Sequence, residues 1–344
     1  MWRGYTLLLT LALLTSCEKT EDISRQEAII EGVPSYWKKY FDSKEELLNN
    51  SAASIENQGV SFAFITDVHV RANNMKSPML LKYLISKGLV NKVVCGGDII
   101  YQSYENKEEA ISELKAWADS TKGMGVVTLL GNHDLNSNYP LDKTQVLSEQ
   151  DFFRIICAES SSFVNYAEGE LYGYEDNENQ KLRYIYLNTG APDHMTIDNI
   201  QIEWLKKRIL ELEKGWTIVI FCHQFWTWRK STDATLEYDE NGTKIEKAIN
   251  SIYDKASASI ACVISGHCHR NYSKKSDKGF VMTSTTCDTG GFNSEQYDPD
   301  TPLRTANTTN EQAFDLFYIN TDTRQIKIIR IGAGDTKSDR SFVY

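Results

Sequence analysis

Several short apolar runs in this chain are each followed at once by residues that can hold a metal ion. The five blocks that follow them contain five of the six histidines of the sequence. They are Asp67-Val68-His69, Gly96-Gly97-Asp98, Gly131-Asn132-His133-Asp134, the single His223, and Gly266-His267-Cys268-His269. A run of this kind predicts a buried strand that ends in polar side chains. Polar groups gathered at strand ends indicate a catalytic site.

The segments between the blocks fit alternation of strands and helices. We expect strands over residues 60–70, 89–95, 125–130, 182–187, 217–222, 259–264 and 280–284. We expect helices over 79–85, 105–122 and 198–214, with one or two more within 34–57. This order is typical of an α/β fold with a mostly parallel sheet. The tail, residues 313–331, alternates around 320–323 and predicts a hairpin that packs in a second sheet.

The length of 344 residues and the hydrophobic content of 41% allow one large domain, which we place at residues 34–344 because no Pro- or Gly-rich linker divides the chain. The formal net charge is -10. Nonspecific binding to nucleic-acid phosphates needs clustered Lys and Arg, so no specific nucleic-acid binding is expected.

The first 17 residues have the features of an export signal. Arg3 is followed by an apolar run, residues 6–14, that is too short to span a bilayer, and the run ends in Leu14-Thr15-Ser16-Cys17. These four residues resemble a bacterial lipobox, which predicts acylation of Cys17 and anchoring to the periplasmic or cell-surface face of a membrane. Residues 18–33 are then a polar tether. The alternative is an ordinary signal with an incidental cysteine.

The remaining cysteines form no CxxC pair, and most lie in apolar runs, where a thiol acts as a small hydrophobic group. Cys268 lies between two candidate histidine ligands. By strand alternation its side chain is expected to point away from them.

The five blocks together supply what a two-metal site needs, which is a bridging carboxylate, imidazoles and a neutral oxygen ligand. Asp67 and His69 are two residues apart, so on a regular strand both face the same side. Asp98 is placed to bridge two ions, and Asn132 offers a carbonyl oxygen. The other candidate ligands are His223, His267 and His269.

In order and spacing these blocks resemble the calcineurin-like metallophosphoesterase superfamily over residues 62–270. The resemblance implies a four-layer α/β/β/α metallophosphatase sandwich with two central mixed sheets. It also implies two divalent ions, with Mn, Fe, Zn and Ni all compatible with mixed O and N ligands. The first ion would take Asp67, His69, Asp98 and His269, and the second Asp98, Asn132, His223 and His267.

The activity implied by the resemblance is hydrolysis of a phosphoester by in-line attack of a metal-bound hydroxide. His133 would act as the acid or transition-state stabiliser, and Asp134 would orient the loop or His133. The motifs do not distinguish a monoester from a diester. The alternative function is a binding or scaffolding module that has the fold without turnover.

Four further residues are candidates for a substrate wall. Tyr101 follows Asp98 at the spacing of purple acid phosphatases, in which a tyrosine ligates ferric iron, but those enzymes lack a histidine at the position of His69, so a wall role is favoured over a ligand role. His194 lies in a loop after a strand. Trp226 and Arg229 follow His223, and their alternative role is packing against the core.

Overall fold

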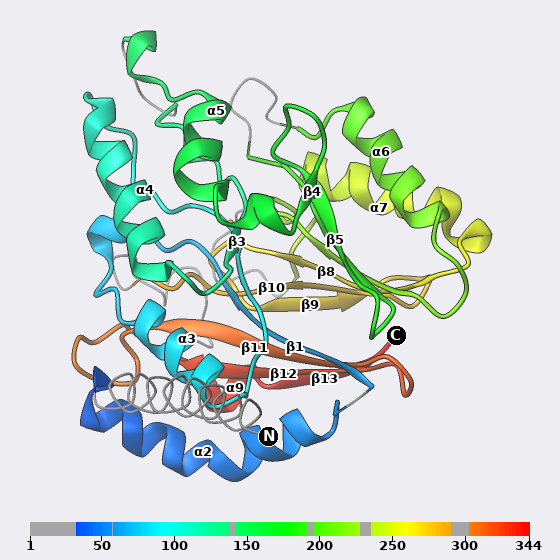
Figure 1. The fold of residues 1–344 in the computed structure, drawn as a ribbon, viewed down its shortest axis with the longest axis horizontal. Coiled ribbons are helices and arrows are strands. Elements are labelled where there is room, and N and C mark those ends of the chain that lie inside the picture. The colour runs from blue at the N-terminus through cyan, green and yellow to red at the C-terminus, as the bar shows by residue number, and fades with distance from the viewer. Residues whose placement is uncertain (1–31, 57, 138–141, 191–195, 228–234, 290–302) are drawn as a thin grey trace, which may run out of the picture.

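The computed structural model describes residues 32–56, 58–137, 142–190, 196–227, 235–289 and 303–344. Two sheets lie face to face, and helices cover their outer faces (Figure 1). The expected four-layer α/β/β/α sandwich with two mixed sheets is therefore confirmed. Among the described residues, no helix is both long and apolar enough to cross a membrane.

The first sheet has six strands in the order β13-β12-β11-β1-β2-β3. Its strands are β1 (Gly59–Ile65), β2 (Val93–Cys95), β3 (Val127–Thr128), β11 (Ala313–Asn320), β12 (Gln325–Gly332) and β13 (Arg340–Val343). β1, β2 and β3 are parallel, whereas β11 pairs with β1 in the antiparallel sense. The tail hairpin is confirmed as β11 and β12, but its expected place in a second sheet is wrong, because it extends the sheet of the N-terminal strands.

The second sheet has seven strands in the order β4-β5-β6-β7-β8-β10-β9. They are β4 (Asn165–Tyr166), β5 (Gly173–Asn177), β6 (Leu182–Tyr186), β7 (Thr217–Phe221), β8 (Ser259–Ser265), β9 (Tyr272–Lys275) and β10 (Val281–Ser284). β6, β7, β8 and β10 run parallel. The edge strands β4 and β9 add antiparallel pairs, so this sheet is also mixed.

The longer helices flank the two sheets. On the first sheet lie α2 (Ser35–Ala53), α3 (Ser77–Ser86) and α4 (Lys107–Thr121), and on the second lie α6 (Asn199–Leu210) and α7 (Glu240–Ile252). The shorter helices are α5 (Glu149–Phe152), which continues into a π-helical turn (Phe153–Cys157), and α9 (Asp335–Ser338). Single turns of 3₁₀ helix lie at Val70–Ala72, Lys143–Gln145, Ser160–Ser162 and Tyr253–Lys255. The expected helices are confirmed, and the lead-in segment forms one helix, α2.

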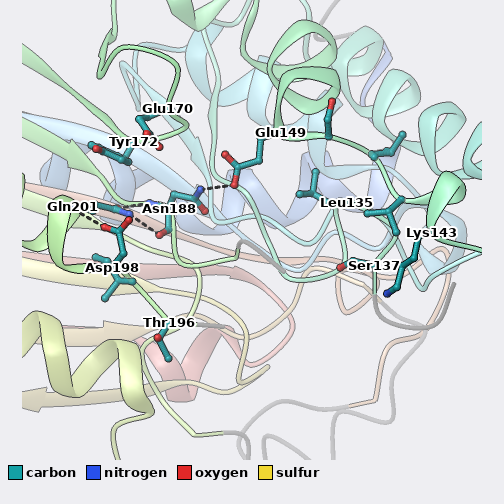
Figure 2. Close-up of a pocket in the computed structure, with 14 residues that line it drawn as sticks. Leu135, Ser137, Lys143, Glu149, Glu170, Tyr172, Asn188, Thr196, Asp198 and Gln201 are labelled. Atoms are coloured by element: carbon teal, nitrogen blue, oxygen red, sulfur yellow. Dashed lines mark hydrogen bonds between the residues drawn. The ribbon is translucent and has the colours of Figure 1, made fainter. Parts of the chain in front are cut away.

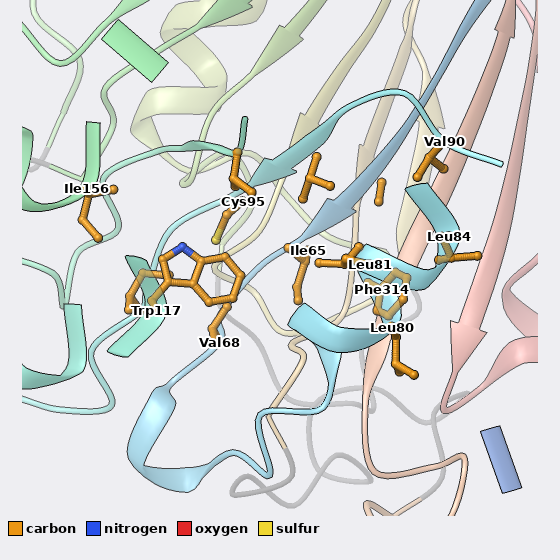
Figure 3. Close-up of a cluster of buried hydrophobic side chains, with 14 of the residues drawn as sticks. Ile65, Val68, Leu80, Leu81, Leu84, Val90, Cys95, Trp117, Ile156 and Phe314 are labelled. Atoms are coloured by element: carbon orange, nitrogen blue, oxygen red, sulfur yellow. The ribbon is translucent and has the colours of Figure 1, made fainter. Parts of the chain in front are cut away.

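Side chains alternate along β1 between two buried layers. Ala63 and Ile65 face the helices of the first sheet, where Figure 3 shows Ile65 near Leu81 of α3. Phe62 faces the other way, into the layer between the sheets, where it stacks on Phe317 at 5.0 Å between ring centroids. A strand that is buried on both faces is apolar at nearly every position, which explains the continuous run in the sequence.

Candidate metal centre

The five blocks that contain the candidate metal ligands lie at the carboxyl ends of strands from both sheets. Asp67 and Asp98 follow β1 and β2, and Asn132 lies beyond β3, all in the first sheet. His223 follows β7 and His267 follows β8, both in the second sheet. The site is therefore assembled where the ends of the two sheets meet, as open α/β folds place their ligand sites.

Two clusters of ligand-type side chains result. One contains Asp67, His69 and His269, and the other contains Asp98, His223 and His267; within each cluster the ligand atoms lie within 4.8 Å of one another. Asn132 belongs with the second cluster, because its Oδ1 lies 3.0 Å from His223 Nε2. The structure thus brings together all seven residues expected to bind metal.

The residues present fit a bound cation in the first cluster. Asp67 Oδ2 accepts hydrogen bonds from Thr66 Oγ1 at 2.7 Å and from the backbone N–H of His267 at 3.0 Å. Asp67 Oδ1 is buried, accepts no hydrogen bond from the described residues, and lies 3.2 Å from His269 Nε2. A buried carboxylate oxygen without a donor is costly unless a cation occupies its lone pairs.

The second cluster is built in the same way around Asp98. Its Oδ1 accepts the backbone N–H of His133 at 2.9 Å, and its Oδ2 lies 3.3 Å from His223 Nε2. One oxygen is thus fixed by the fold while the other faces the ligand histidine. This is the arrangement in which a carboxylate can be a metal ligand.

Backbone carbonyls fix which imidazole nitrogen faces each cluster. His69 Nδ1 lies 3.0 Å from the carbonyl of Ile100, and His223 Nδ1 lies 2.7 Å from the carbonyl of Gly96. A carbonyl only accepts, so Nδ1 carries a proton in each case and Nε2 is the nitrogen that faces the cluster. Such outer contacts are typical of metal-ligating histidines.

The ligands converge through left-handed backbone rather than through strand alternation. β1 ends at Ile65, and both Asp67 and His69 have positive φ, 52° and 45°. His267 and His269 likewise have φ of 67° and 52°. The expectation that Asp67 and His69 share the face of a regular strand is therefore wrong. Left-handed backbone is unfavourable for residues other than glycine, and its concentration here is typical of a functional site.

Two glycines of the motifs are required by close approach. A Cβ on Gly131 would lie 2.1 Å from the backbone nitrogen of Asp98, and a Cβ on Gly266 would lie 1.9 Å from Thr66 Oγ1. Any other residue at these positions would push the metal-binding loops apart.

Asp134 ties two of these loops together. Its buried carboxylate accepts backbone N–H groups from Asp98, Ile99, Ile100 and Gly131 at 2.7–3.1 Å. Burial raises its pKa to about 6, with a further contribution from the charge of Asp98. The structure places Asp134 as a loop-orienting residue, one of the two roles that the sequence left open.

The histidines of the clusters differ in protonation before a metal binds. Burial lowers the pKa of His69 to about 4 and that of His267 to about 3, so both are neutral near pH 7. Burial also acts to lower the pKa of His223, but Asp98 beside it raises the pKa to about 9. For His269 burial is again opposed, by Cys287 and Asp67, and its pKa lies well above the ordinary value.

His133 and His267 are partly exposed, whereas His69, His223 and His269 are buried. The side chain of His133 is 25% exposed, whereas that of His223 is fully buried. His133 Nε2 lies 3.8 Å from Asp98 Oδ2, and its ring lies edge-on to that of His69, with 5.4 Å between centroids. It is thus at the open side of the site, within reach of a bound ligand.

The structure places the candidate wall residues in different surroundings. The Tyr101 ring lies edge-on to His69, with 6.0 Å between centroids, which matches a position in the wall. Trp226 is fully buried and stacks on Tyr238 at 4.9 Å, which favours packing, the alternative role, over a place in a substrate wall. His194 and Arg229 lie outside the described residues.

Cys268 points away from the histidines, as expected. Its Sγ lies 3.4 Å from Ser284 Oγ and 3.8 Å from the carbonyl of Arg270. The six cysteines of the described residues are all free and buried. They therefore add packing rather than disulfides.

Two supporting residues were missed in the sequence. Thr189 Oγ1 accepts the backbone N–H groups of His223 and Gln224 at 3.1 and 2.9 Å. Gln224 Nε2 donates to Asn132 Oδ1 at 3.5 Å. Gln224 directly follows a candidate ligand, which is the only sequence signal for it. Thr189 had no comparable signal beyond its place in a loop after a strand.

Comparisons with known proteins agree with this geometry. The sequence profile of the family described as calcineurin-like phosphoesterase matches residues 60–271. No match was found among curated proteins.

Two solved structures illustrate the similarity in fold. A dimetal phosphatase from Danio rerio is 13% identical, with a TM-score of 0.54 and coverage of 83% of this chain and 99% of that chain. A purple acid phosphatase from yellow lupin (Lupinus luteus) is 12% identical, with a TM-score of 0.54 and coverage of 83% of this chain and 54% of that chain. At this identity the likeness concerns the fold alone.

Proposed function

Because the chain belongs to the calcineurin-like phosphoesterase family and is therefore a metal-dependent phosphoester hydrolase, we propose that it works with two divalent ions, one at each cluster. The observation that carries this proposal is the pair of clusters, Asp67 with His69 and His269, and Asp98 with His223 and His267, in which every member except His267 is buried. Each combines one carboxylate with two imidazoles, a set that suits Mn, Fe, Zn or Ni.

Asp98 is the proposed bridge between the two ions. It belongs to the second cluster, and its charge also raises the pKa of His69 in the first cluster against the larger effect of burial. Asn132 completes the second site with a neutral oxygen. When bound, the ions acidify water to provide a nucleophile near neutral pH and offset the charge that develops on the phosphoryl oxygens.

His133 is the proposed acid. Its backbone N–H is held by Asp98 Oδ1, which fixes the residue beside the clusters, while its ring is partly exposed and belongs to neither cluster. An imidazolium in this place can give its Nε2 proton to the leaving oxygen as the P–O bond breaks. Tyr101, next to His69, is proposed as a wall of the same opening.

The direct test is hydrolysis of a matched pair of chromogenic substrates, one phosphate monoester and one diester, by the purified protein. Chelation should abolish activity, and added Mn, Zn, Fe or Ni should restore it. The better substrate of the pair assigns the ester class. No hydrolysis of either ester by protein that binds two ions would favour a binding or scaffolding role.

We also propose that the chain is exported and anchored through lipid on Cys17. The support is the lipobox-like Leu14-Thr15-Ser16-Cys17 after a short apolar run. Labelled palmitate should be incorporated by bacteria that express the chain and not by those that express Cys17→Ala. Equal labelling of both would contradict the proposal.

A further inference from the structure

A cavity of about 720 Å³ is lined in part by Asn188, whose neighbour Thr189 accepts the backbone N–H of His223 (Figure 2). Leu135 and Ser137, on the loop that carries His133, form one side of it. Asn188, after β6, and Gln201, in the first turn of α6, form another. The volume falls within the range of roughly 300–1,000 Å³ that is typical of small-molecule sites.

Hydrogen bonds connect the cavity to the metal ligands. Gln224, which donates to Asn132, accepts a hydrogen bond from Asn241 Nδ2 at 3.1 Å. Asn241 Oδ1 in turn accepts the backbone N–H of Ile197, a lining residue, at 2.5 Å. The same framework therefore positions the cavity and the second cluster.

The amides of the cavity are held in fixed orientations. Gln201 Oε1 accepts the backbone N–H of Asn188 at 2.8 Å, and Gln201 Nε2 donates to the backbone carbonyl of Asn188 at 3.0 Å. Asn188 Nδ2 donates to Glu149 Oε1 at 3.3 Å, a contact drawn in Figure 2. Preset polar groups of this kind give a small-molecule site its specificity.

The lining is rich in hydrogen-bond acceptors. It contains three carboxylates, Glu149, Glu170 and Asp198, against one basic residue among the described lining, Lys143. Glu170 and Asp198 form no ion pair within the described part of the chain. Ser137 adds a hydroxyl group, which both donates and accepts. The hydroxyl of Thr196 accepts from Lys244 Nζ at 3.1 Å and can still donate, whereas that of Ser148 is bonded to Asp151 in both senses.

The composition of this lining favours phosphoesters whose leaving groups have particular charges and hydrogen-bonding groups. Carboxylates only accept hydrogen bonds, so the bound group must supply several donors. A second phosphate would be repelled by the excess negative charge. The amides and hydroxyl groups pair best with a ligand that both donates and accepts, as hydroxyl groups do and a simple ammonium does not.

We infer that this cavity binds a polyhydroxylated leaving group, a sugar or polyol, of the phosphoester that is hydrolysed at the metal centre. The inference rests on the proposed function. The reacting phosphoryl group would lie at the clusters, with the hydroxyl groups of the leaving group between Asn188 and the carboxylates of the cavity.

The test compares three substrates of the metal-loaded protein: glucose 6-phosphate, phosphoethanolamine and p-nitrophenyl phosphate. The variants are Glu170→Gln and Asp198→Asn, each of which removes charge while keeping size. Asp198→Asn also keeps an oxygen for the hydrogen bond that it accepts from Gln201 N at 2.7 Å at the start of α6. The matched control is Glu168→Gln, an exposed carboxylate that does not line the cavity.

Glucose 6-phosphate should be the best of the three substrates. Either variant should lower its kcat/KM about fivefold, as expected for one weakened hydrogen bond, and leave p-nitrophenyl phosphate within about twofold. The control should change neither. Faster hydrolysis of phosphoethanolamine than of glucose 6-phosphate would overturn the inference in favour of a cationic group, and parallel losses on all three substrates would show that the carboxylates act only on structure.

A failure of the proposed function would look different, because then none of the three substrates would be hydrolysed. In that case calorimetric titration with glucose 6-phosphate decides the inference. Binding to the metal-loaded protein that is weakened by Glu170→Gln and not by Glu168→Gln supports the cavity as a sugar-phosphate site. Equal binding by the unsubstituted protein, Glu170→Gln and Glu168→Gln, or no binding by any of them, overturns the inference.

Discussion

The carboxylate of Asp134 accepts the backbone N–H of Asp98 at 3.0 Å, so one buried acid fixes the backbone of another. The same carboxylate also holds the next two residues after Asp98 and Gly131 at the start of the neighbouring block. Asp98, the proposed bridging ligand, and the loop that bears His133 therefore have a common support, and their separation depends on it.

We predict that Asp134→Asn lowers the free energy of unfolding by roughly 2–4 kcal/mol. The substitution replaces one carboxylate oxygen by an NH2 group, so one acceptor is lost and a buried donor then faces the backbone N–H donors. Metal affinity should fall as well, since Asp98 loses its support. Urea denaturation and metal titration measure the two effects. Asp142→Asn is the matched control, because Asp142 is exposed and accepts a local N–H from Thr144. Unchanged stability and metal affinity in Asp134→Asn would refute the common support.

His133→Ala should keep both ions and lose turnover. The side chain is accessible and belongs to neither metal-binding cluster, so its removal leaves the ligands in place. We expect kcat to fall roughly 10²–10⁴-fold, the usual range for loss of a general acid. Metal analysis and steady-state kinetics on the same preparation decide the matter, and full activity of the variant would rule out the acid role.

Asp98→Asn should weaken metal binding, and the loss of activity should follow from the loss of metal. The amide keeps an oxygen for the N–H of His133 but removes the charge that faces His223. We expect fewer than two ions per chain and a fall in activity in proportion. Elemental analysis after dialysis gives the metal content. Two retained ions with normal turnover would contradict the bridging role.

Metal binding should release protons near pH 7. In the metal-free protein the pKa of His223 is about 9, raised by Asp98 against the opposing effect of burial, so this histidine is protonated below pH 9 and must lose its proton to bind an ion. Because this folded-state pKa is raised, affinity for metal should rise with pH up to about 9, where the competing proton is gone. Calorimetry in buffers of different ionisation enthalpy measures the release. Affinity that is flat between pH 6 and 9 would count against this assignment.

The sequence was sufficient to locate most of the central strands and the seven candidate ligands that the structure brings together in two clusters. Each block is short and follows an apolar run, so local patterns locate it. The place of the tail hairpin could not be read in this way, because nothing local in Ala313–Asn320 specifies pairing with β1 over a separation of some 250 residues.

The local geometry of the site was also beyond the sequence. A regular strand was the simplest explanation for the spacing of Asp67 and His69, but contacts from Gly97 and Asp98 hold these residues in left-handed backbone instead. Trp226 could be assigned to a wall or to the core only once Tyr238 and Tyr272 were seen around it. Both cases depend on tertiary contacts that no short pattern contains.

The central claim is that the two clusters each hold one ion and that both ions are needed for hydrolysis. It is tested most directly by titrating metal into chelated protein while phosphoester hydrolysis is recorded. We predict that activity reaches its maximum at two ions per chain, and that His267→Ala, which lacks a ligand of the second cluster, binds one ion and stays inactive. Full activity at one ion per chain, or an active His267→Ala, would contradict the claim.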